Sequence, residues 1–327
     1  MTAQAGALAE FIDLEPVVED FETAVIAGLS RTIKTLPCKF FYDQIGSELF
    51  SRICRLDEYY PTRTEIGILR RIAARIAELA GPHSHLIEFG SGDSIKVRLL
   101  LEAMTSPARH TAIDISRDHL RNSAKDLARK FPEIEIAAVC ADYTQSFDVP
   151  SPEETPDAKR VGFFPGSTIG NFTPDEAVAF LKSTASLLDG GDLVIGVDLK
   201  KDHERLNAAY NDSEGVTAAF NLNLLVRINR ELGGNFEIDA YEHRAHYNAG
   251  EGRIEMHLIS LRDQTVAIGN TRFNFSEGET IHTENSYKYG IEEFQEAAAR
   301  GGFRALDCWT DEDRLFSIHY LRAQGAT

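Results

Sequence analysis

Cysteine pairs and recognisable metal-binding patterns are missing from this 327-residue sequence. The four cysteines, Cys38, Cys54, Cys140 and Cys308, are scattered, and no two of them form a C-x-x-C pair. Dispersed thiols are typical of a reduced, cytoplasmic protein rather than one held together by disulfides. The ten histidines form no H-E-x-x-H or comparable pattern, so the sequence predicts no bound metal.

Positive charge is also scarce. The chain has 34 lysines and arginines against 51 aspartates and glutamates, a formal net charge of −17. Because binding to a phosphate backbone needs clustered positive charge, a nucleic-acid partner is disfavoured. There is no run of 18 apolar residues and no basic-then-apolar leader at the start, so we expect neither a membrane span nor secretion. We expect a cytoplasmic monomer.

Two glycines follow an apolar stretch in the segment His85-Leu-Ile-Glu-Phe-Gly-Ser-Gly-Asp-Ser94. Glycines between a strand and a helix let the backbone approach a bulky ligand closely. A second apolar stretch ends at Asp114, 22 residues after Gly92, where a carboxylate can accept hydrogen bonds from a ribose. The third glycine of a dinucleotide fingerprint is replaced by Ile95. The pattern favours an adenosine-containing cofactor without a pyrophosphate, with an ordinary strand-turn-helix unit as the alternative.

Apolar stretches and amphipathic segments alternate from about residue 62 to residue 198. The periodicity predicts strands at 86–89, 111–115, 134–141, 160–165 and 192–198, with helices at 64–79, 95–104, 117–131 and 174–188. Thr173 is expected to cap the last helix, and Pro174 suits its first turn. Short connections between alternating strands and helices imply a doubly wound parallel sheet. A helix at 291–300 and a hairpin over 303–322 would complete it.

The alternation stops after Asp198. Helices are expected at 201–210 and 215–232, and strands at 236–247, 253–263, 264–275 and 280–289. We therefore expect two domains. One comprises residues 62–198 and 287–327, and a second, discontinuous α+β domain comprises residues 1–61 and 199–286.

Several other segments are too particular to be explained by core packing. They are Phe41-Tyr-Asp-Gln-Ile-Gly-Ser-Glu-Leu-Phe50, Leu56-Asp-Glu-Tyr-Tyr-Pro-Thr-Arg-Thr-Glu65, Gly166-Ser-Thr-Ile-Gly-Asn-Phe172, Ala208-Ala-Tyr-Asn-Asp-Ser-Glu-Gly-Val-Thr217 and Thr283-Glu-Asn-Ser-Tyr-Lys288. In this order they resemble the L-histidine Nα-methyltransferases of ergothioneine biosynthesis, from about residue 15 to 322. The resemblance implies a class I, Rossmann-like S-adenosylmethionine (SAM) methyltransferase domain with a separate substrate domain. It also implies trimethylation of the α-amine of L-histidine to hercynine.

Methyl transfer from a sulfonium to an amine is an in-line displacement without a covalent enzyme intermediate. The enzyme must hold a neutral amine lone pair against the methyl carbon and exclude water. Such chemistry requires no Ser-His-Asp or Cys-His set, and none stands out. Amide and phenolic oxygens and aromatic faces can surround the amine as it becomes cationic.

The resemblance implies that residues near the amine and the carboxylate of histidine are polar but uncharged. Asn171, which follows the fourth expected strand, would orient the α-amine, with Tyr42 beside it. Tyr59 and Tyr210 would bind the carboxylate through their hydroxyl groups. Read without the resemblance, Asn171 is a turn asparagine and the tyrosines are packing residues.

Glu284 and Ser286 alternate on an expected strand, so their side chains face the same way. Together they are candidates for binding the two imidazole nitrogens. A carboxylate in a pocket needs such a partner, because leaving it buried and unpaired is costly. Met256 would pack beside the ring, with core filling as the alternative.

The resemblance also implies a SAM site, with S-adenosylhomocysteine as the product. Lys96 would reach the methionine carboxylate, Asp114 the ribose, and Asp142 with Tyr143 the adenine, while Gly166 would leave the methyl path clear. The full set expected around the cofactor is Gly90, Gly92, Lys96, Asp114, Asp142, Tyr143 and Gly166.

The sequence departs from the family pattern after Glu284, where Asn285 and Tyr287 stand in a run expected to be more apolar. Both point away from Glu284 on an ideal strand, so we expect changed affinity for histidine rather than another substrate. Alternatives are methylation of another amino acid such as tryptophan, or of a protein N-terminus, and a SAM-binding module without turnover. A nicotinamide dehydrogenase is disfavoured by the missing glycine.

Overall fold

The computed structural model describes residues 6–16, 20–92, 94–145 and 147–325, and it divides the chain into two compact units. The first unit comprises Met1–Val18, Thr64–Leu199 and Tyr289–Thr327, and the second comprises Glu19–Arg63 and Lys200–Lys288. Three of the boundaries lie within two residues of those expected. The N-terminal assignment was wrong, because strand β1 (Glu10–Asp13) pairs in parallel with β5 of the first unit.

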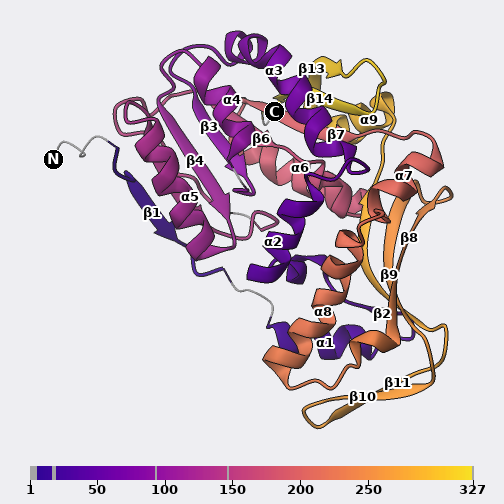
Figure 1. Ribbon diagram of the computed structural model, residues 1–327. Coiled ribbons are helices and arrows are strands. Elements are labelled where there is room, and N and C mark those ends of the chain that lie inside the picture. The colour runs from indigo at the N-terminus through magenta and orange to yellow at the C-terminus, as the bar shows by residue number, and fades with distance from the viewer. Residues whose placement is uncertain (1–5, 17–19, 93, 146, 326–327) are drawn as a thin grey trace. The chain divides into compact units, whose positions relative to one another are not determined.

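An eight-stranded sheet forms the centre of the first unit (Figure 1). Six neighbouring strands are parallel, β14 is antiparallel to β7, and β13 is antiparallel to β14. This arrangement confirms the predicted class I methyltransferase fold, with β1 as an added edge strand. The strand order is β1, β5 (Glu135–Cys140), β4 (Arg109–Asp114), β3 (His85–Phe89), β6 (Arg160–Phe164), β7 (Asp192–Asp198), β14 (Phe316–Ala323) and β13 (Phe303–Thr310).

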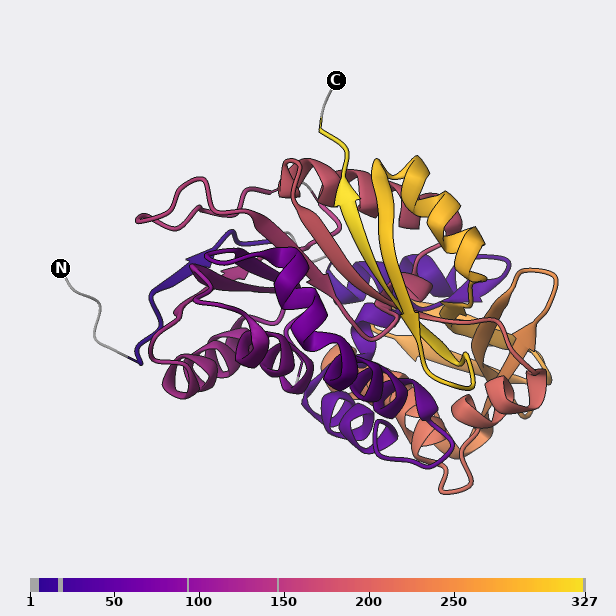
Figure 2. The same ribbon diagram turned by 90° about the horizontal axis from the view of Figure 1, so that it is seen from above.

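Helices cover both faces of this sheet (Figure 2). One face carries α3 (Tyr60–Ala80), α4 (Ile95–Ala103) and α5 (Arg117–Lys130), and the other carries α6 (Pro174–Leu188) and α9 (Ile291–Arg300). As expected, Thr173 caps α6, here with Glu176 in a capping box.

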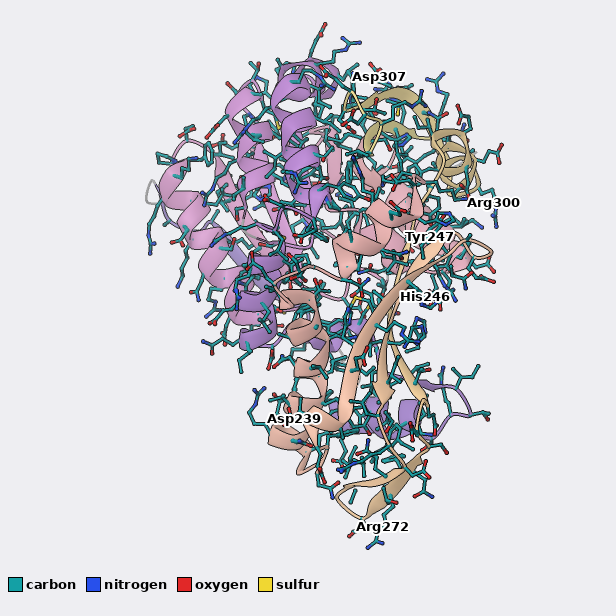
Figure 3. The ribbon with its side chains drawn as sticks, turned by 45° about the vertical axis from the view of Figure 1, so that its right-hand side comes forward. Asp239, His246, Tyr247, Arg272, Arg300 and Asp307 are labelled. Atoms are coloured by element: carbon teal, nitrogen blue, oxygen red, sulfur yellow. The ribbon has the colours of Figure 1, made fainter. Side chains whose placement is uncertain are left out.

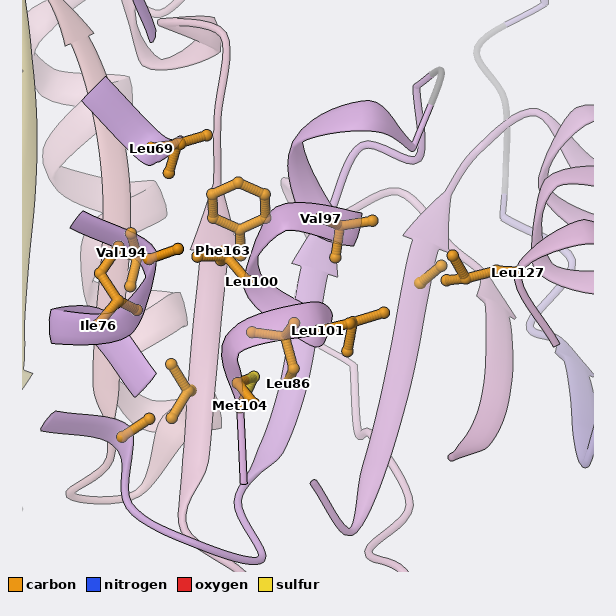
Figure 4. Packing of buried hydrophobic residues seen from close by; sticks show 14 of the residues in the cluster. Leu69, Ile76, Leu86, Val97, Leu100, Leu101, Met104, Leu127, Phe163 and Val194 are labelled. Atoms are coloured by element: carbon orange, nitrogen blue, oxygen red, sulfur yellow. The ribbon is translucent and has the colours of Figure 1, made fainter. Parts of the chain in front are cut away.

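Aliphatic side chains at helical spacing join α3 and α4 to the sheet. Each one that is fully buried contributes about 1.5–3 kcal/mol to folding, which fixes the helices against the strands. Figure 4 shows part of this cluster, including Leu69, Ile76, Leu86, Val97, Leu100, Leu101, Phe163 and Val194.

The second unit is built on a four-stranded sheet in the order β2 (Lys34–Thr35), β12 (Thr280–Tyr287), β9 (Arg253–Ser260) and β8 (Tyr241–Asn248). Helix α8 (Val216–Leu232) packs on β8, β9 and α2 (Gln44–Ile53). Its buried positions Phe220, Leu224 and Ile228 show the helical spacing seen in the sequence. The remaining elements are α1 (Phe21–Leu29), η1 (Cys38–Phe41), α2 (Gln44–Ile53), α7 (His203–Tyr210) and η3 (Ile238–Ala240).

Two strand predictions in this unit were wrong in detail. The single strand expected at 264–275 is a hairpin of β10 (Gln264–Ile268) and β11 (Thr271–Phe275). Gly269 reverses the chain with a φ of 53°, a conformation that glycine adopts without strain. The strand expected from residue 236 begins only at Tyr241, because the short helix η3 precedes it.

None of the described helices combines the length and apolar character needed to cross a bilayer. All four cysteines are free thiols.

Candidate active site

The loop after β3 provides open space next to backbone. Gly90 adopts a φ of 80°, which side chains with a Cβ rarely tolerate. Apart from each glycine and its two chain neighbours, no atom of the described residues lies within 4 Å of the position that a Cβ would take at Gly90 or Gly92. A ligand can therefore approach the main chain here without meeting protein atoms.

Asp114 fastens this loop to the end of β4. Its Oδ2 accepts a hydrogen bond from the Ser91 amide at 2.9 Å, and its Oδ1 accepts one from the Ser116 amide at 2.7 Å. Burial raises the pKa of Asp114, while these two amides oppose the rise. A carboxylate offers about four acceptor sites, so capacity for a ribose diol remains.

The segment after β5 lies beside the end of β4, because the Ala141 amide donates to the Asp114 carbonyl at 3.1 Å. Asp142 accepts from the amide and the hydroxyl of Thr144 through a single oxygen, Oδ1. The ring of Tyr143 stands edge-on to Phe164, 5.8 Å between centroids. Residues predicted to meet the ribose and the adenine thus lie at neighbouring strand ends, where doubly wound sheets bind ligands.

Glu65 of α3 was not predicted as a site residue. Its carboxylate is 1% exposed, accepts from the Gly166 amide at 2.9 Å, and pairs with Lys96 Nζ at 2.6 Å. Gly166 has a φ of 82°, and a Cβ placed there would lie 3.5 Å from Lys96 Nζ. One buried acid therefore holds two of the predicted cofactor residues together.

Asn171 ends the short helix η2 (Thr168–Asn171), which follows β6 in the first unit. Ser167, at a φ of 56°, begins this turn and accepts from the Asp198 amide at 2.9 Å. No described residue forms a hydrogen bond with the Asn171 side chain. The alternative interpretation of Asn171 as a turn asparagine would have its side-chain amide bonded within its own loop, and the described residues show no such bond.

A cavity that is partly open to solvent lies within the second unit. Four of the substrate residues predicted from the sequence line it: Tyr59, Tyr210, Met256 and Glu284. The other lining residues, none of which was predicted as a site residue, are Phe50, Ile53, Ala209, Thr217 and Phe220. Phe50, Ala209 and Thr217 do fall within the distinctive segments.

Glu284 is the ionisable acid of this cavity. It lies on β12 directly opposite Met256 of β9, and no described residue forms a hydrogen bond with its carboxylate. Burial raises the pKa of Glu284 to about 7, and the positive charge of Lys288 acts in the opposite direction. A carboxylate held among aromatic rings without a donor is suited to a ligand that brings one.

Tyr59 and Tyr210 form one wall, with their rings edge-on and their centroids 6.1 Å apart. Burial, followed by the proximity of Tyr210, raises the pKa of Tyr59 well above its usual value, so its hydroxyl stays protonated. Tyr59 can therefore donate a hydrogen bond to a carboxylate, whereas Tyr210 must first turn its single hydroxyl proton away from Ser286.

Ser286 and Tyr42 are near the cavity but do not line it. Ser286 is 4% exposed and accepts a hydrogen bond from the Tyr210 hydroxyl at 2.8 Å. Tyr42 is 41% exposed, and its ring contacts Phe50 and Phe220 edge-on. Their direct contact with substrate remains a prediction.

A cluster of three side chains among the described residues could supply ligands to a metal ion. Its members are His246, Glu255 and His257, whose potential ligand atoms lie within 4.8 Å of one another. It arises from strand pairing, since His246 of β8 (Figure 3) lies opposite Glu255 of β9, and the sequence spacing gave no sign of it. Burial opposes ionisation of Glu255, but hydrogen bonds led by Arg253 lower its pKa to about 2. The carboxylate is thus already satisfied by protein donors, and the group does not line the cavity.

Comparison with known proteins gives a consistent picture. The family model described as histidine-specific methyltransferase, SAM-dependent, matches residues 21–323. A histidine N-alpha-methyltransferase of Mycolicibacterium smegmatis is 42% identical over 318 residues, covering 95% of this chain and 97% of that protein. One from Mycobacterium tuberculosis is 41% identical over 301 residues, covering 90% and 92%. A 4-dimethylallyltryptophan N-methyltransferase of Claviceps purpurea is 27% identical over 332 residues, covering 94% and 96%. The chain belongs to the family of histidine-specific, SAM-dependent methyltransferases.

Proposed function

We propose that this protein methylates the α-amine of L-histidine three times, with SAM as the methyl donor, and so produces hercynine. The observation that carries the proposal is Glu284, a carboxylate in an aromatic cavity with no hydrogen bond from a described residue. An imidazole N–H is a donor that fits such a group. The family and the two mycobacterial relatives support the same substrate.

The residues around the glycine loop fit SAM, because the loop leaves open space and Asp114 retains unused acceptor capacity. Asp114 would hold the ribose, and Lys96, oriented by Glu65, would hold the methionine carboxylate. Bound SAM supplies a methyl group activated by a sulfonium centre.

Protein groups then position the acceptor. Tyr59 and Tyr210 donate to the carboxylate of histidine, and Glu284 accepts from the imidazole. The amide oxygen of Asn171 accepts from the α-amine and directs its lone pair, while Tyr42 shields the amine from water. Orientation of this kind contributes to the rate without any proton transfer by a strong base.

A second candidate is methylation of another amino acid, such as tryptophan, and the match to the Claviceps purpurea enzyme favours its consideration. The pair of Glu284 and Ser286 separates the two substrates. Imidazole and indole can each donate one N–H to Glu284, but an indole lacks the second ring nitrogen that Ser286 is expected to bind. Replacing Glu284 with Ala should raise the KM for histidine by about two orders of magnitude.

The direct test offers the protein labelled SAM and all twenty amino acids, followed by identification of methylated products by mass. We expect mono-, di- and trimethylated histidine. Methylation of a different amino acid would overturn the assignment, and SAM binding without any product would identify a non-catalytic module.

We also propose that the protein acts as a cytoplasmic monomer on this small-molecule substrate. A sedimentation measurement giving a mass well above the 36.3 kDa of one chain would contradict the monomer.

A further inference from the structure

Lys288, the residue directly after β12, is a buried cation beside the proposed histidine cavity. Its side chain is 2% exposed. The ammonium lies 2.8 Å from Ser286 Oγ and 3.0 Å from Tyr210 Oη, and 5.0 Å from the centre of the Tyr210 ring. An ammonium without water is costly unless its donors are used, so these contacts are specific rather than incidental.

The three groups form a triangle in which the direction of each hydrogen bond can be assigned. An ammonium can only donate, so both hydroxyl oxygens accept from Lys288. Tyr210 also donates to Ser286 at 2.8 Å. Ser286 Oγ therefore accepts two hydrogen bonds, one from Lys288 and one from Tyr210. Its own hydroxyl proton can then be donated to a group outside the triangle.

Glu284 and Ser286 alternate on β12, whose pairing with β9 is regular from Glu284 to Tyr287, so their side chains lie on one face of the strand. Lys288 directly follows the strand, and its ammonium reaches the same face because it donates to Ser286 Oγ. This face therefore presents a carboxylate acceptor (Glu284), a hydroxyl (Ser286) and a cation (Lys288), in that order. Asn285 and Tyr287 point the other way, and the hydroxyl of Tyr287 accepts from Arg253.

We propose that Lys288 is a positioning residue that holds the hydroxyl groups of Tyr210 and Ser286 as donors toward the substrate and balances the charge of Glu284. The proposal rests on the function proposed above. It means that the site selects a neutral imidazole, with its N–H on Glu284 and its bare nitrogen facing the Ser286 hydroxyl. When substrate binds, the Tyr210 hydroxyl donates to the substrate carboxylate instead of to Ser286. Its oxygen continues to accept the hydrogen bond from Lys288.

The charges around Glu284 support this role. Burial disfavours the ionised form of Glu284, and the positive charge of Lys288 stabilises that form. The Cys38 thiol of η1 and the Tyr59 hydroxyl interact with Glu284 as well, and burial raises the pKa of both, so they stay neutral near pH 7. The groups that β9 and α8 contribute to the cavity, Met256, Thr217 and Phe220, carry no charge.

The test compares the variants Lys288→Gln and Lys288→Arg with the wild type. Lys288→Gln keeps a donor and similar length but removes the charge and adds an acceptor. We expect its KM for histidine to rise about tenfold, and the acidic limb of kcat/KM to move up by about one pH unit. Lys288→Arg should restore the position of the acidic limb.

The matched control is Lys34→Met on β2, another largely buried lysine of the same sheet, which pairs with Glu279 instead. It should lower thermal stability without moving the pH profile. Loss of stability in Lys288→Gln with an unchanged KM and an unchanged acidic limb would overturn the proposal, since Lys288 would then be only structural.

A second readout needs no turnover. The carboxyl carbon of Glu284 can be titrated by ¹³C NMR in the free protein, with Glu284→Gln identifying its signal. We expect a higher midpoint in Lys288→Gln than in the wild type, and equal midpoints would contradict the charge-balancing role. If the wild type failed to methylate histidine, the proposed function would fall, and this titration would still decide the role of Lys288.

Discussion

At the scale of single residues, we expect Glu284 to make activity dependent on pH. Its pKa is raised to about 7, so the carboxylate becomes protonated as the pH falls through neutrality and can no longer accept from an imidazole N–H. We expect kcat/KM for histidine to fall about tenfold per pH unit below 7 from this group alone.

The comparison that isolates this effect uses Glu284→Gln, which cannot titrate. Protonation of the substrate itself lowers the rate of both proteins, so their ratio reports on Glu284. A ratio that stays constant from pH 6 to pH 9 would show that the carboxylate does not contact the substrate.

Asn171 is the residue proposed to orient the amine. Because its side-chain amide has no described hydrogen-bond partner, Asn171→Ala should cost little stability. We expect kcat to drop by about two orders of magnitude while SAM affinity, measured by calorimetry, changes less than about threefold. An equal loss of SAM affinity would assign Asn171 to the cofactor.

Tyr59, Tyr210 and Glu284 were predictable because each stands in a segment that resembles the family, whereas Met256 was proposed from its place on an expected strand. Glu65 ends one of these segments but was given no role, since an acid in an amphipathic helix is usually on a solvated face. Its burial depends on the approach of Gly196 in β7, where a Cβ would collide with the Glu65 carboxylate. Such complementarity arises only when a helix and a distant strand pack together.

At the scale of elements, Glu65 links α3 to the loop after β6. Replacing it with Gln keeps the shape but removes the charge that pairs with Lys96. We expect SAM affinity to fall about tenfold in Glu65→Gln and in Gly196→Ala, which displaces the same carboxylate. Gly67→Ala is the control on α3, because no atom lies within 4 Å of its Cβ position among the described residues. Unchanged SAM affinity in both variants would limit Glu65 to a structural role.

The parallel strands and their helices were predictable because their apolar periodicity is long and their caps are clear. The pairing of β1 was not, since four residues with no buried face in their pattern could join any open edge. The turn at Gly269 was missed because both flanking segments look like strands, and one glycine within a strand can also mark a bulge.

At the scale of the whole molecule, the predicted cofactor residues belong to the first unit and the cavity to the second. Two variants should therefore affect different ligands. Glu284→Ala should leave SAM affinity within about twofold of the wild type, and Asp114→Ala should weaken SAM binding by about tenfold or more. Calorimetry with S-adenosylhomocysteine can measure both. Comparable losses of affinity in the two variants would contradict this division of binding.

The proposed binding of the histidine imidazole by Glu284 can be seen in a crystal structure with L-histidine and S-adenosylhomocysteine bound. We expect an imidazole nitrogen about 3 Å from a Glu284 carboxylate oxygen and the substrate carboxylate at the hydroxyls of Tyr59 and Tyr210. A ring bound elsewhere, with Glu284 facing water, would contradict it.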